Sequence, residues 1–331
     1  MSEGGRGTSP LNAAPWLAVL GASGRVGTLL RGSGAMPGVL WASRRGGKGV
    51  QAWDMLADPP PQVLRGCEVM ICLAGAVPGA APSEHTRLGL AAVAAAAQAG
   101  IGHVLIASSI AVYGAEAAPW REEAPTRPRT HYGRAKAEME VALLNGVRGA
   151  GPGRVQVPET GGTALRSRMG EGTPCPPAPW EVPKGAPQQQ SGPGGPRICL
   201  LRLGNVVGAD ALSGAIAGSQ PLTLDRCPGG GPVRSMIGPV TLGRVLMALA
   251  TGARSGARLP PVLNIAQPGP LAMAELCAAA GRHFGWRAAG PATLPRAVLD
   301  VAALQALLPA PLPPADAAAL IGEWRAAGGL G

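Results

Sequence analysis

A serine, a tyrosine and a lysine between residues 103 and 136 have the types and spacing of a proton-transfer site. Ser109 follows an apolar run at 103–107, and Tyr132 and Lys136 stand four residues apart at the start of a helical pattern. On a helix, residues with that spacing lie on one face. A phenol beside an ammonium group can exchange a proton with a carbonyl or an alcohol, because the positive charge favours the phenolate. The chain has two tyrosines, and both lie in this stretch.

The same residues also fit a simpler interpretation, in which Tyr132 and Lys136 belong to a solvated helix face. His131 fits the surface better than a catalytic role, and Ser108 is the less favoured of the two adjacent serines. The proton-transfer interpretation therefore depends on support from neighbouring elements.

A glycine-rich turn between an apolar run and a helical pattern supplies that support. The run at 16–20 leads into a turn at 21–27 with glycines at its first, fourth and seventh positions. Glycines let a pyrophosphate approach the backbone and a helix N-terminus attracts negative charge, so this context predicts a dinucleotide site. An ordinary loop in a glycine-rich chain is the alternative. The residues expected to contact the dinucleotide are Gly21, Ser23, Gly24, Arg25, Val26 and Gly27.

Two arginines after the second apolar run favour NADP over NAD. The run at 39–42 is followed by Ser43, Arg44 and Arg45, where dinucleotide-binding folds usually carry an acidic residue for the adenosine ribose. Guanidinium groups bind phosphates in bidentate fashion, so Arg44 and Arg45 suit the 2′-phosphate of NADP. We expect NADP, with NAD as the alternative cofactor. A solvated basic turn is the simpler interpretation.

Apolar runs alternate with helical patterns along the chain, which predicts a doubly wound, parallel α/β sheet. Expected strands lie at 16–20, 39–42, 50–55, 68–74, 103–107, 198–203 and 262–266, and expected helices at 84–98, 132–143, 239–250, 272–283, 298–308 and 315–326. Ligands bind beyond the carboxyl ends of such strands. The glycine turn, the arginine pair, Gly75 and Ser109 each follow a strand, so we expect all four at one edge of the sheet.

The composition narrows the classes of partner. The net charge is +10, but the basic residues are dispersed without aromatic interleaving, so a small anionic ligand fits better than nucleic acid. The six cysteines form no CxxC pair and no histidine stands at ligand spacing, so we expect no metal, no disulfide framework and a reduced cytoplasmic location. Cys72 and Cys199 read as small core residues. The apolar stretch at 88–99 is too short for a bilayer, and residues 1–15 lack a signal-peptide core, so no membrane partner is expected.

Taken in order, these motifs resemble the extended short-chain dehydrogenase/reductases, the NAD-dependent epimerase/dehydratase family. The matching pieces are the glycines of 21–27, residues 73–75, residues 108–114, the Tyr132 and Lys136 pair, residues 201–206 and residues 234–237. The resemblance implies a Rossmann-type sheet with a small C-terminal substrate lobe. The expected division is a flexible N-terminus (1–14), an NAD(P)-binding Rossmann core (15–148), a disordered Pro/Gly-rich insertion (149–196), and the remaining core strands with the substrate lobe (197–331).

The resemblance also implies roles for the catalytic candidates. Tyr132 would be the general acid/base. Lys136 would lower the tyrosine pKa and bind the nicotinamide ribose. Ser109 would bind the reacting oxygen of the substrate.

Further contacts follow from the same resemblance. Leu73, Ala74 and Gly75 would contact the cofactor. Asn205 and Arg234 fall where family members contact a small-molecule substrate, and the arginine there often meets a nucleotide-sugar phosphate. Family members often dimerise, so a homodimer is also an expectation.

Two departures from the family pattern bear on the chemistry. Glu68 stands where the family usually has an aspartate before the fourth strand. No asparagine occurs at 83–98, where the family often places one for a proton relay.

Three functions remain open at this point. The first is an NAD(P)-dependent oxidoreductase that transfers a hydride between nicotinamide and a small carbonyl or alcohol; the arginine pair and the short C-terminal lobe favour it. The second is a sugar-nucleotide epimerase or dehydratase, which would remove a hydride and later return it. The third is a non-catalytic dinucleotide sensor.

Overall fold

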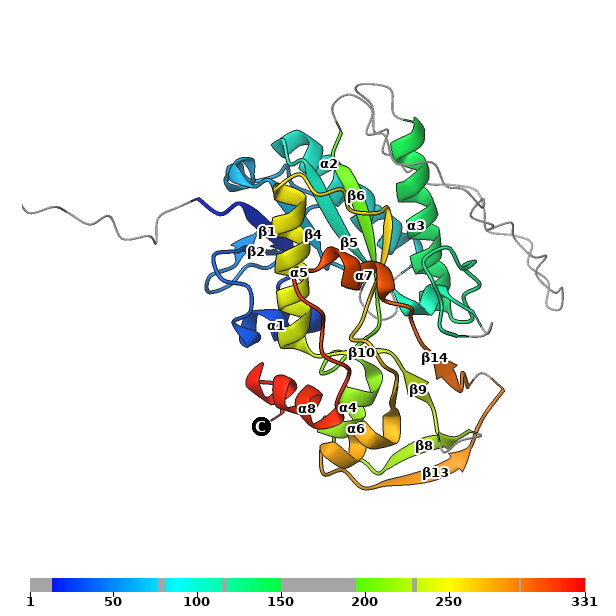
Figure 1. The fold of residues 1–331 in the computed structure, drawn as a ribbon. Helices are drawn as coiled ribbons and strands as arrows, with labels where there is room; N and C mark the ends of the chain where they lie inside the picture. Colours follow the sequence, from blue (N-terminus) through cyan, green and yellow to red (C-terminus); the bar gives the residue numbers. More distant parts are fainter. Residues whose placement is uncertain are drawn as a thin grey trace, which may run out of the picture.

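The computed structural model describes residues 14–76, 81–114, 118–149, 195–227, 231–291 and 293–330, with backbone only for 147–149. These residues form an α/β fold around a seven-stranded sheet of order β11-β6-β5-β4-β1-β2-β3 (Figure 1). Every neighbouring pair of strands in it is parallel. The strands are β1 (Leu17–Leu20), β2 (Leu40–Ser43), β3 (Gln51–Ala52), β4 (Val69–Cys72), β5 (His103–Ser109), β6 (Arg197–Leu203) and β11 (Val262–Ile265). The expected doubly wound Rossmann-type sheet is confirmed.

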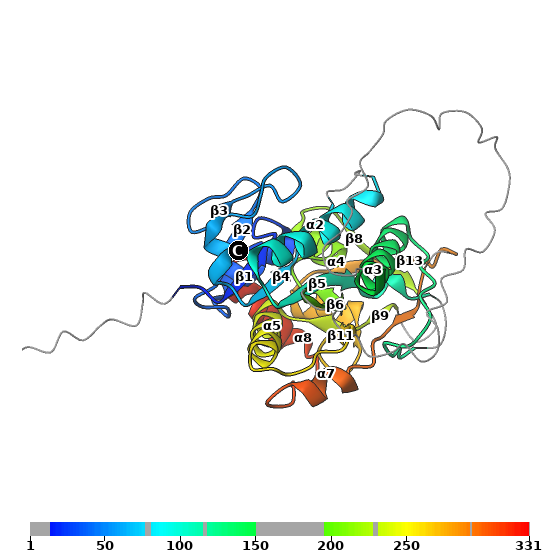
Figure 2. The ribbon, with the colours of Figure 1, turned by 90° about the horizontal axis from the view of Figure 1, so that it is seen from above.

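The central strands are apolar on both faces because helices cover both (Figure 2). Alternate residues of one strand enter different cores: Leu17 and Val19 pack on one side of the sheet, and Ala18 and Leu20 on the other. The first side is covered mainly by α5 (Pro239–Arg254), with α1 (Arg25–Ser33) against it, and by α7 (Ala302–Leu307). The second is covered by α2 (Ser83–Ala99) and α3 (His131–Gly149), which pack on each other. Burying each large aliphatic side chain stabilises this sandwich by about 1.5–3 kcal/mol.

The parallel arrangement brings four strand ends to one edge of the sheet. β5, β4, β1 and β2 are neighbours in that order, and their last residues are Ser109, Cys72, Leu20 and Ser43. The glycine turn, the arginine pair, residues 73–75 and the Ser109 stretch therefore meet at this edge, as the sequence predicts.

A smaller lobe lies beyond the same edge (Figure 1). It contains α4 (Ala211–Ala217), α6 (Met273–Ala279) and α8 (Ala317–Ala326), with the short strands β7 (Asn205–Val206), β8 (Leu222–Arg226), β9 (Val233–Arg234), β10 (Met236–Ile237), β12 (Leu271–Ala272), β13 (Phe284–Ala288) and β14 (Arg296–Ala297). A third apolar cluster, which includes Leu276, Leu320 and Trp324, fills it.

Three expected elements are shorter in the structure. The strand expected at 50–55 forms ladder pairs only over β3, after which the chain turns into the cleft described below. The helix expected at 272–283 ends with α6 because Gly281 takes the left-handed conformation (φ +71°), and residues 284–288 then pair with β8 as β13. The helix expected at 298–308 is confined to α7, since Val298 is held in extended structure by accepting a backbone hydrogen bond from Trp120.

The remaining predictions concern two segments of the chain, two cysteines and membrane-spanning helices. The insertion at 149–196 lies almost wholly outside the described residues, as does the N-terminus up to residue 13. Cys72 and Cys199 are buried free thiols in the core, as expected. Within the described helices, none is long and apolar enough to cross a membrane.

Candidate active site

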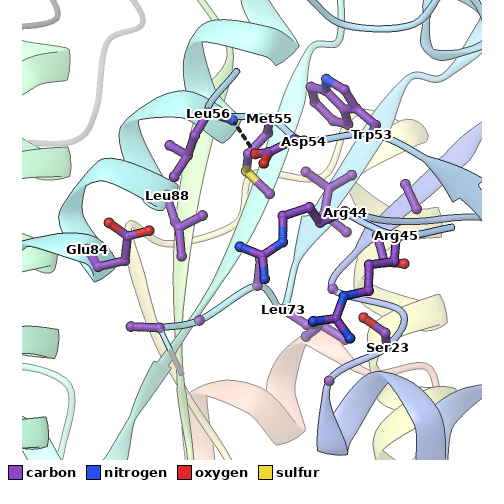
Figure 3. A pocket seen from close by; sticks show the side chains of 18 residues that line it. Ser23, Arg44, Arg45, Trp53, Asp54, Met55, Leu56, Leu73, Glu84 and Leu88 are labelled. Carbon is purple, nitrogen blue, oxygen red and sulfur yellow. Dashed lines mark hydrogen bonds between the residues drawn. The ribbon is translucent and has the colours of Figure 1, made fainter. Parts of the chain in front are cut away.

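A cleft of about 400 Å³ opens at the shared strand edge. Figure 3 shows its side chains converging from the ends of β1, β2, β3 and β4 and from the start of α2. The lining residues are Leu20, Gly21, Ser23, Gly24, Ala42, Ser43, Arg44, Arg45, Trp53, Asp54, Met55, Leu56, Leu73, Ala74, Gly75, Ala76, Glu84 and Leu88. Eight of the sequence-predicted cofactor residues are among them: Gly21, Ser23, Gly24, Arg44, Arg45, Leu73, Ala74 and Gly75.

The glycine turn is shaped by close backbone contacts. Gly21 has φ +92°, and a Cβ on it would lie 2.7 Å from the Ala74 nitrogen. A Cβ on Gly27 would lie 2.2 Å from the Gly21 oxygen. Gly24 caps α1 without a side-chain hydrogen bond. The turn thus brings bare backbone to the cleft and leaves N–H groups at the start of α1 open to an anion.

The end of β2 is basic and incompletely paired. Figure 3 shows both arginine side chains extending into the cleft, with the Arg45 guanidinium toward Ser23. Neither Arg44 nor Arg45 forms an ion pair with any residue that the structure describes. The Ser43 hydroxyl is buried in the cleft wall and has no hydrogen-bond partner among the described residues. This end of the cleft therefore offers one orphaned hydroxyl and two positive charges to a ligand.

The residues after β3 form a wall that the sequence did not single out. Trp53, Asp54, Met55 and Leu56 line the cleft, together with Leu88 of α2. The Asp54 carboxylate accepts the Leu56 N–H at 3.1 Å, which fixes the turn. Apolar walls beside a carboxylate suit a flat heterocycle with an amino group. An aspartate near the end of the strand predicted at 50–55, at the same edge as the glycine turn, was the available signal.

Ser109, Tyr132 and Lys136 gather beside this cleft at the β5 end. Tyr132 and Lys136 lie in the first turns of α3, and the Lys136 Nζ donates to the Ala107 carbonyl at 2.8 Å. Tyr132 is 49% exposed, yet its phenol is enclosed enough that burial raises its pKa, an effect that a hydrogen bond with Ser109 partly offsets. Ser109 and Tyr132 are therefore joined by a hydrogen bond, with Lys136 one helical turn further along α3. None of the three lines the cleft itself.

Burial also governs the charge of Lys136. The side chain is only 4% exposed, and this desolvation lowers its pKa from 10.5 to about 8. At neutral pH the lysine is still mostly protonated, and it lies one helical turn along α3 from Tyr132.

A buried network holds the backbone of this site. The Ser108 hydroxyl donates to the Glu140 carboxylate at 2.5 Å, so Ser108 is occupied away from Tyr132. Arg202 of β6 pairs with Glu140 at 2.7 Å and donates to the Tyr113 hydroxyl at 2.8 Å. Arg202 and Glu140 are 2% and 3% exposed. The network ties β5, β6 and α3 together one helical turn beyond Lys136.

The predicted substrate residues lie together in the smaller lobe. The Asn205 side chain donates to Asp210 at 2.9 Å, and Asp210 caps α4 by accepting the Ser213 N–H. Burial lowers the pKa of Arg234, while Asp225 and Asp210 among its neighbours partly oppose that effect. Among the described residues, the Arg234 side chain donates one hydrogen bond, to the carbonyl of the adjacent Val233.

Besides Lys136, three predicted cofactor residues of the glycine turn lie outside the cleft lining. Arg25 turns toward the smaller lobe, where its guanidinium approaches the Ala209 carbonyl at 3.5 Å. Val26 packs against the sheet core and Gly27 is buried under the turn. The Arg25 guanidinium therefore lies at the smaller lobe, and the cleft lining contains Arg44 and Arg45 without it. In the part of the chain that is described, no group of three metal-ligating side chains comes together.

The model of the NAD dependent epimerase/dehydratase family matches residues 76–151. This segment contains α2, β5 and α3, and with them Ser109, Tyr132 and Lys136. The resemblance predicted from the ordered motifs is thus confirmed over this segment. A search of curated proteins gave no match.

Solved structures match along nearly the whole chain. MoeE5 in complex with UDP-glucose and NAD has a TM-score of 0.64 at 20% identity, covering 94% of this chain and 97% of that one. The NAD-dependent NDP-hexosamine 5,6-dehydratase TunA has a TM-score of 0.65 at 15% identity, covering 93% and 97%. The UDP-glucose-4-epimerase from Stenotrophomonas maltophila, with bound NAD and formylated UDP-arabinopyranose, has a TM-score of 0.66 at 15% identity, covering 94% and 97%. At these identities the likeness establishes the fold.

Proposed function

We propose that the protein is an NAD(P)-dependent enzyme that acts on an alcohol or carbonyl carbon of a nucleotide sugar, as an epimerase or dehydratase. One observation carries the proposal: the cleft at the glycine turn and the group of Ser109, Tyr132 and Lys136 lie at the same edge of one parallel sheet. A dinucleotide laid along that edge from the cleft would extend toward Tyr132.

The residues of the cleft fit such a cofactor. A Cβ at Gly21 or Gly27 would fill space that the backbone needs, and the start of α1 has N–H groups for a pyrophosphate. The wall at residues 53–56 would receive the adenine, and Ser43 would bond an oxygen of its ribose. When bound, the nicotinamide accepts or returns a hydride.

The chain's own contribution is to move and hold protons at the substrate oxygen. Tyr132 would give or take the proton, and Ser109 would hold the same oxygen through its hydroxyl. Lys136 would lower the barrier through its positive charge, which favours the phenolate form of Tyr132. These roles rest on the family resemblance together with the geometry of the three side chains.

The substrate class follows from two supports. The structures with the same fold named above carry UDP-sugars or act on an NDP-hexosamine. The half-buried Arg234 makes no ion pair with a described residue, so it offers a cation to a diphosphate. These supports favour the second of the three sequence hypotheses over the first.

A reductase of small carbonyls that uses NADPH is the second candidate, and Arg44 with Arg45 favours it. Two unpaired guanidinium groups at the end of β2 suit a 2′-phosphate. Enzymes that return the hydride to the same substrate have no need of the cellular NADPH pool. NADP is therefore the cofactor that this candidate requires.

One assay separates the two candidates. The protein is incubated with UDP-glucose or UDP-N-acetylglucosamine and a catalytic amount of NAD⁺ or NADP⁺, and products are followed by chromatography. We expect an altered sugar nucleotide without net accumulation of the reduced cofactor, and loss of that activity in Tyr132→Phe. Stoichiometric oxidation of NADPH by small aldehydes or ketones, with no change in any sugar nucleotide, would instead identify the reductase. Dinucleotide binding without turnover of either the sugar nucleotides or the small carbonyls would support the third hypothesis, a non-catalytic dinucleotide sensor.

Cofactor choice is tested separately through Arg44 and Arg45. Replacing both by alanine should weaken NADP⁺ binding by about tenfold to a hundredfold for each lost charge-assisted contact, and change NAD⁺ binding little. Arg31→Ala is the matched control, since its guanidinium donates to the Lys48 carbonyl and does not line the cleft. Tryptophan fluorescence titration measures both affinities. Equal losses for NAD⁺ and NADP⁺ would contradict recognition of the 2′-phosphate.

A further inference from the structure

His85 is a buried side chain of α2 to which the proposed chemistry gives no role. It lies in the first turn of the helix and is 7% exposed. Neither the motifs nor the cleft lining include it. Its imidazole ring, however, contacts both the loop that follows β4 and the ring of Tyr132.

One side of His85 contacts the loop that follows β4. Its Nδ1 accepts the Ala76 N–H in a long hydrogen bond of 3.5 Å. Its Cε1 lies 3.5 Å from the point that a Cβ on Gly75 would occupy. Gly75 and Ala76 both line the cleft, so the imidazole packs against the outer side of the cleft wall.

The other side of His85 contacts the acid/base candidate. The His85 and Tyr132 rings meet edge to face, with centroids 5.5 Å apart and planes at 76°. Such contacts fix ring orientation and contribute about 0.5–1.5 kcal/mol beyond burial. About half of the Tyr132 surface is open to solvent, so the His85 ring and the hydrogen bond with Ser109 both contribute to fixing the orientation of the phenol ring.

The protonation state of His85 is consistent with both contacts. Burial, with the charge of Lys136 added, lowers its pKa to about 4. The imidazole is therefore neutral at neutral pH, and its Nδ1 is free to accept from Ala76.

We propose that His85 is a positioning residue that holds Tyr132 in register with the cofactor-binding loop at 73–76 and transmits movement of that loop to the tyrosine ring. The inference rests on the proposed function, since it assigns Tyr132 to the proton transfer. His85 itself touches neither substrate nor cofactor in this scheme. The competing interpretation is a histidine that only fills the core between α2 and α3.

Three variants separate the two contacts. His85→Phe keeps an aromatic edge for Tyr132 and removes the acceptor for Ala76. His85→Asn keeps an acceptor near the Nδ1 position and removes the ring. His85→Ala removes both, and His103→Asn, at the far end of β5, is the matched control. Thermal unfolding establishes that each variant is folded.

Tyr132 can be followed without a known substrate, because the chain contains only two tyrosines. Incorporation of 3-fluorotyrosine gives two ¹⁹F resonances, which Tyr132→Phe assigns, and the buried Tyr113 serves as an internal reference. In His85→Ala and His85→Asn we expect the Tyr132 resonance to move or broaden by more than its line width, and in His85→Phe to stay near its original position. Addition of NADP⁺ should shift the Tyr132 resonance in the unmodified chain, and at least half of that shift should be lost in His85→Phe.

Once a substrate is turned over, His85→Ala should lower kcat by about tenfold, as expected for a misplaced acid/base, while the NADP⁺ dissociation constant changes less than twofold. His85→Phe should recover part of kcat.

The inference is overturned if the Tyr132 resonance of His85→Ala and its response to NADP⁺ match those of the unmodified chain. It is equally overturned if His103→Asn perturbs Tyr132 as strongly as His85→Ala. Absence of dinucleotide binding would instead refute the proposed function, and the resonance in the unliganded protein would still decide whether His85 positions the ring.

Discussion

The charged amino group of Lys136 is buried, and its desolvation lowers the free energy of unfolding. In the unfolded chain its amino group has an ordinary pKa near 10.5, whereas burial lowers it to about 8 in the folded protein. Below pH 8 the folded protein must therefore keep an ammonium ion that would be better solvated in the unfolded chain. The cost of this charge is roughly 3 kcal/mol at neutral pH.

Lys136→Met should therefore stabilise the protein at pH 7. The expected gain is about 2 kcal/mol, because loss of the hydrogen bond to the Ala107 carbonyl offsets about 1 kcal/mol of the relief. The unfolded state binds more protons between pH 8 and 10.5, so the unmodified chain gains stability with rising pH in this window and the variant's advantage shrinks. Urea unfolding at pH 7 and at pH 10 measures both values. An advantage that stays constant with pH would contradict the assigned shift.

At the level of single residues, the sequence predicts the side chains that belong to spaced patterns and misses those that act through tertiary contact. The four-residue spacing of Tyr132 and Lys136 is local, and so is the position of Ser109 after an apolar run. His85 stands in an alanine-rich helix with no pattern around it, and only the packing of α2 on α3 brings it to Tyr132. Asp54 lies in the cleft because the chain leaves β3 early, which the alternation of residues 50–55 does not show.

Among the elements, the contact between the glycine turn and α1 should tolerate no side chain. Gly27→Ala would place a Cβ 2.2 Å from the Gly21 oxygen, so we expect a loss of at least 2 kcal/mol in the free energy of unfolding. Gly146→Ala, in the exposed part of α3 with no atom within 4 Å of the added Cβ, should stabilise by about 0.5–1 kcal/mol. Chemical denaturation of the pair measures the difference. Equal effects would mean that the turn relaxes away from α1.

The buried pair of Glu140 and Arg202 should behave as a unit. Glu140→Ala or Arg202→Met alone leaves a buried charge without its partner, so each should cost about 3–5 kcal/mol. The double variant should cost less than the sum of the two, because neither charge remains to be stranded. A double-mutant cycle from urea unfolding checks this. Additive losses would show that the two charges are solvated independently.

The sequence predicts the elements that form long apolar runs. It misses the strands that form only by pairing with another strand far away in the chain. β1, β4, β5, β6 and β11 are largely buried on both faces and appear in the sequence as mostly apolar runs. β8 and β13 pair with each other across the lobe, and most of β13 is exposed, so its residues carry no apolar run. The short α6 likewise ends two residues before a left-handed glycine, Gly281, that helical periodicity alone did not mark as a stop.

For the whole molecule, a cofactor that binds only the folded state should stabilise the fold by mass action. NADP⁺ or NAD⁺ at one hundred times its dissociation constant should raise the free energy of unfolding by about 2.7 kcal/mol. Differential scanning fluorimetry with each dinucleotide, and with AMP as a partial ligand, measures the shift in Tm. No shift with either dinucleotide would contradict a cofactor site in the cleft.

The direction of the strands has a consequence for how the chain can be re-engineered. α3 ends at Gly149 and β6 begins at Arg197, which pairs with His103 at the amino end of β5. Both points lie at the edge of the sheet opposite the cleft (Figure 1). Inserted domains, affinity tags or new termini created by circular permutation at this junction would leave the edge that carries the cleft untouched. The connection between α3 and β6 can therefore change in length without altering the geometry of the candidate active site.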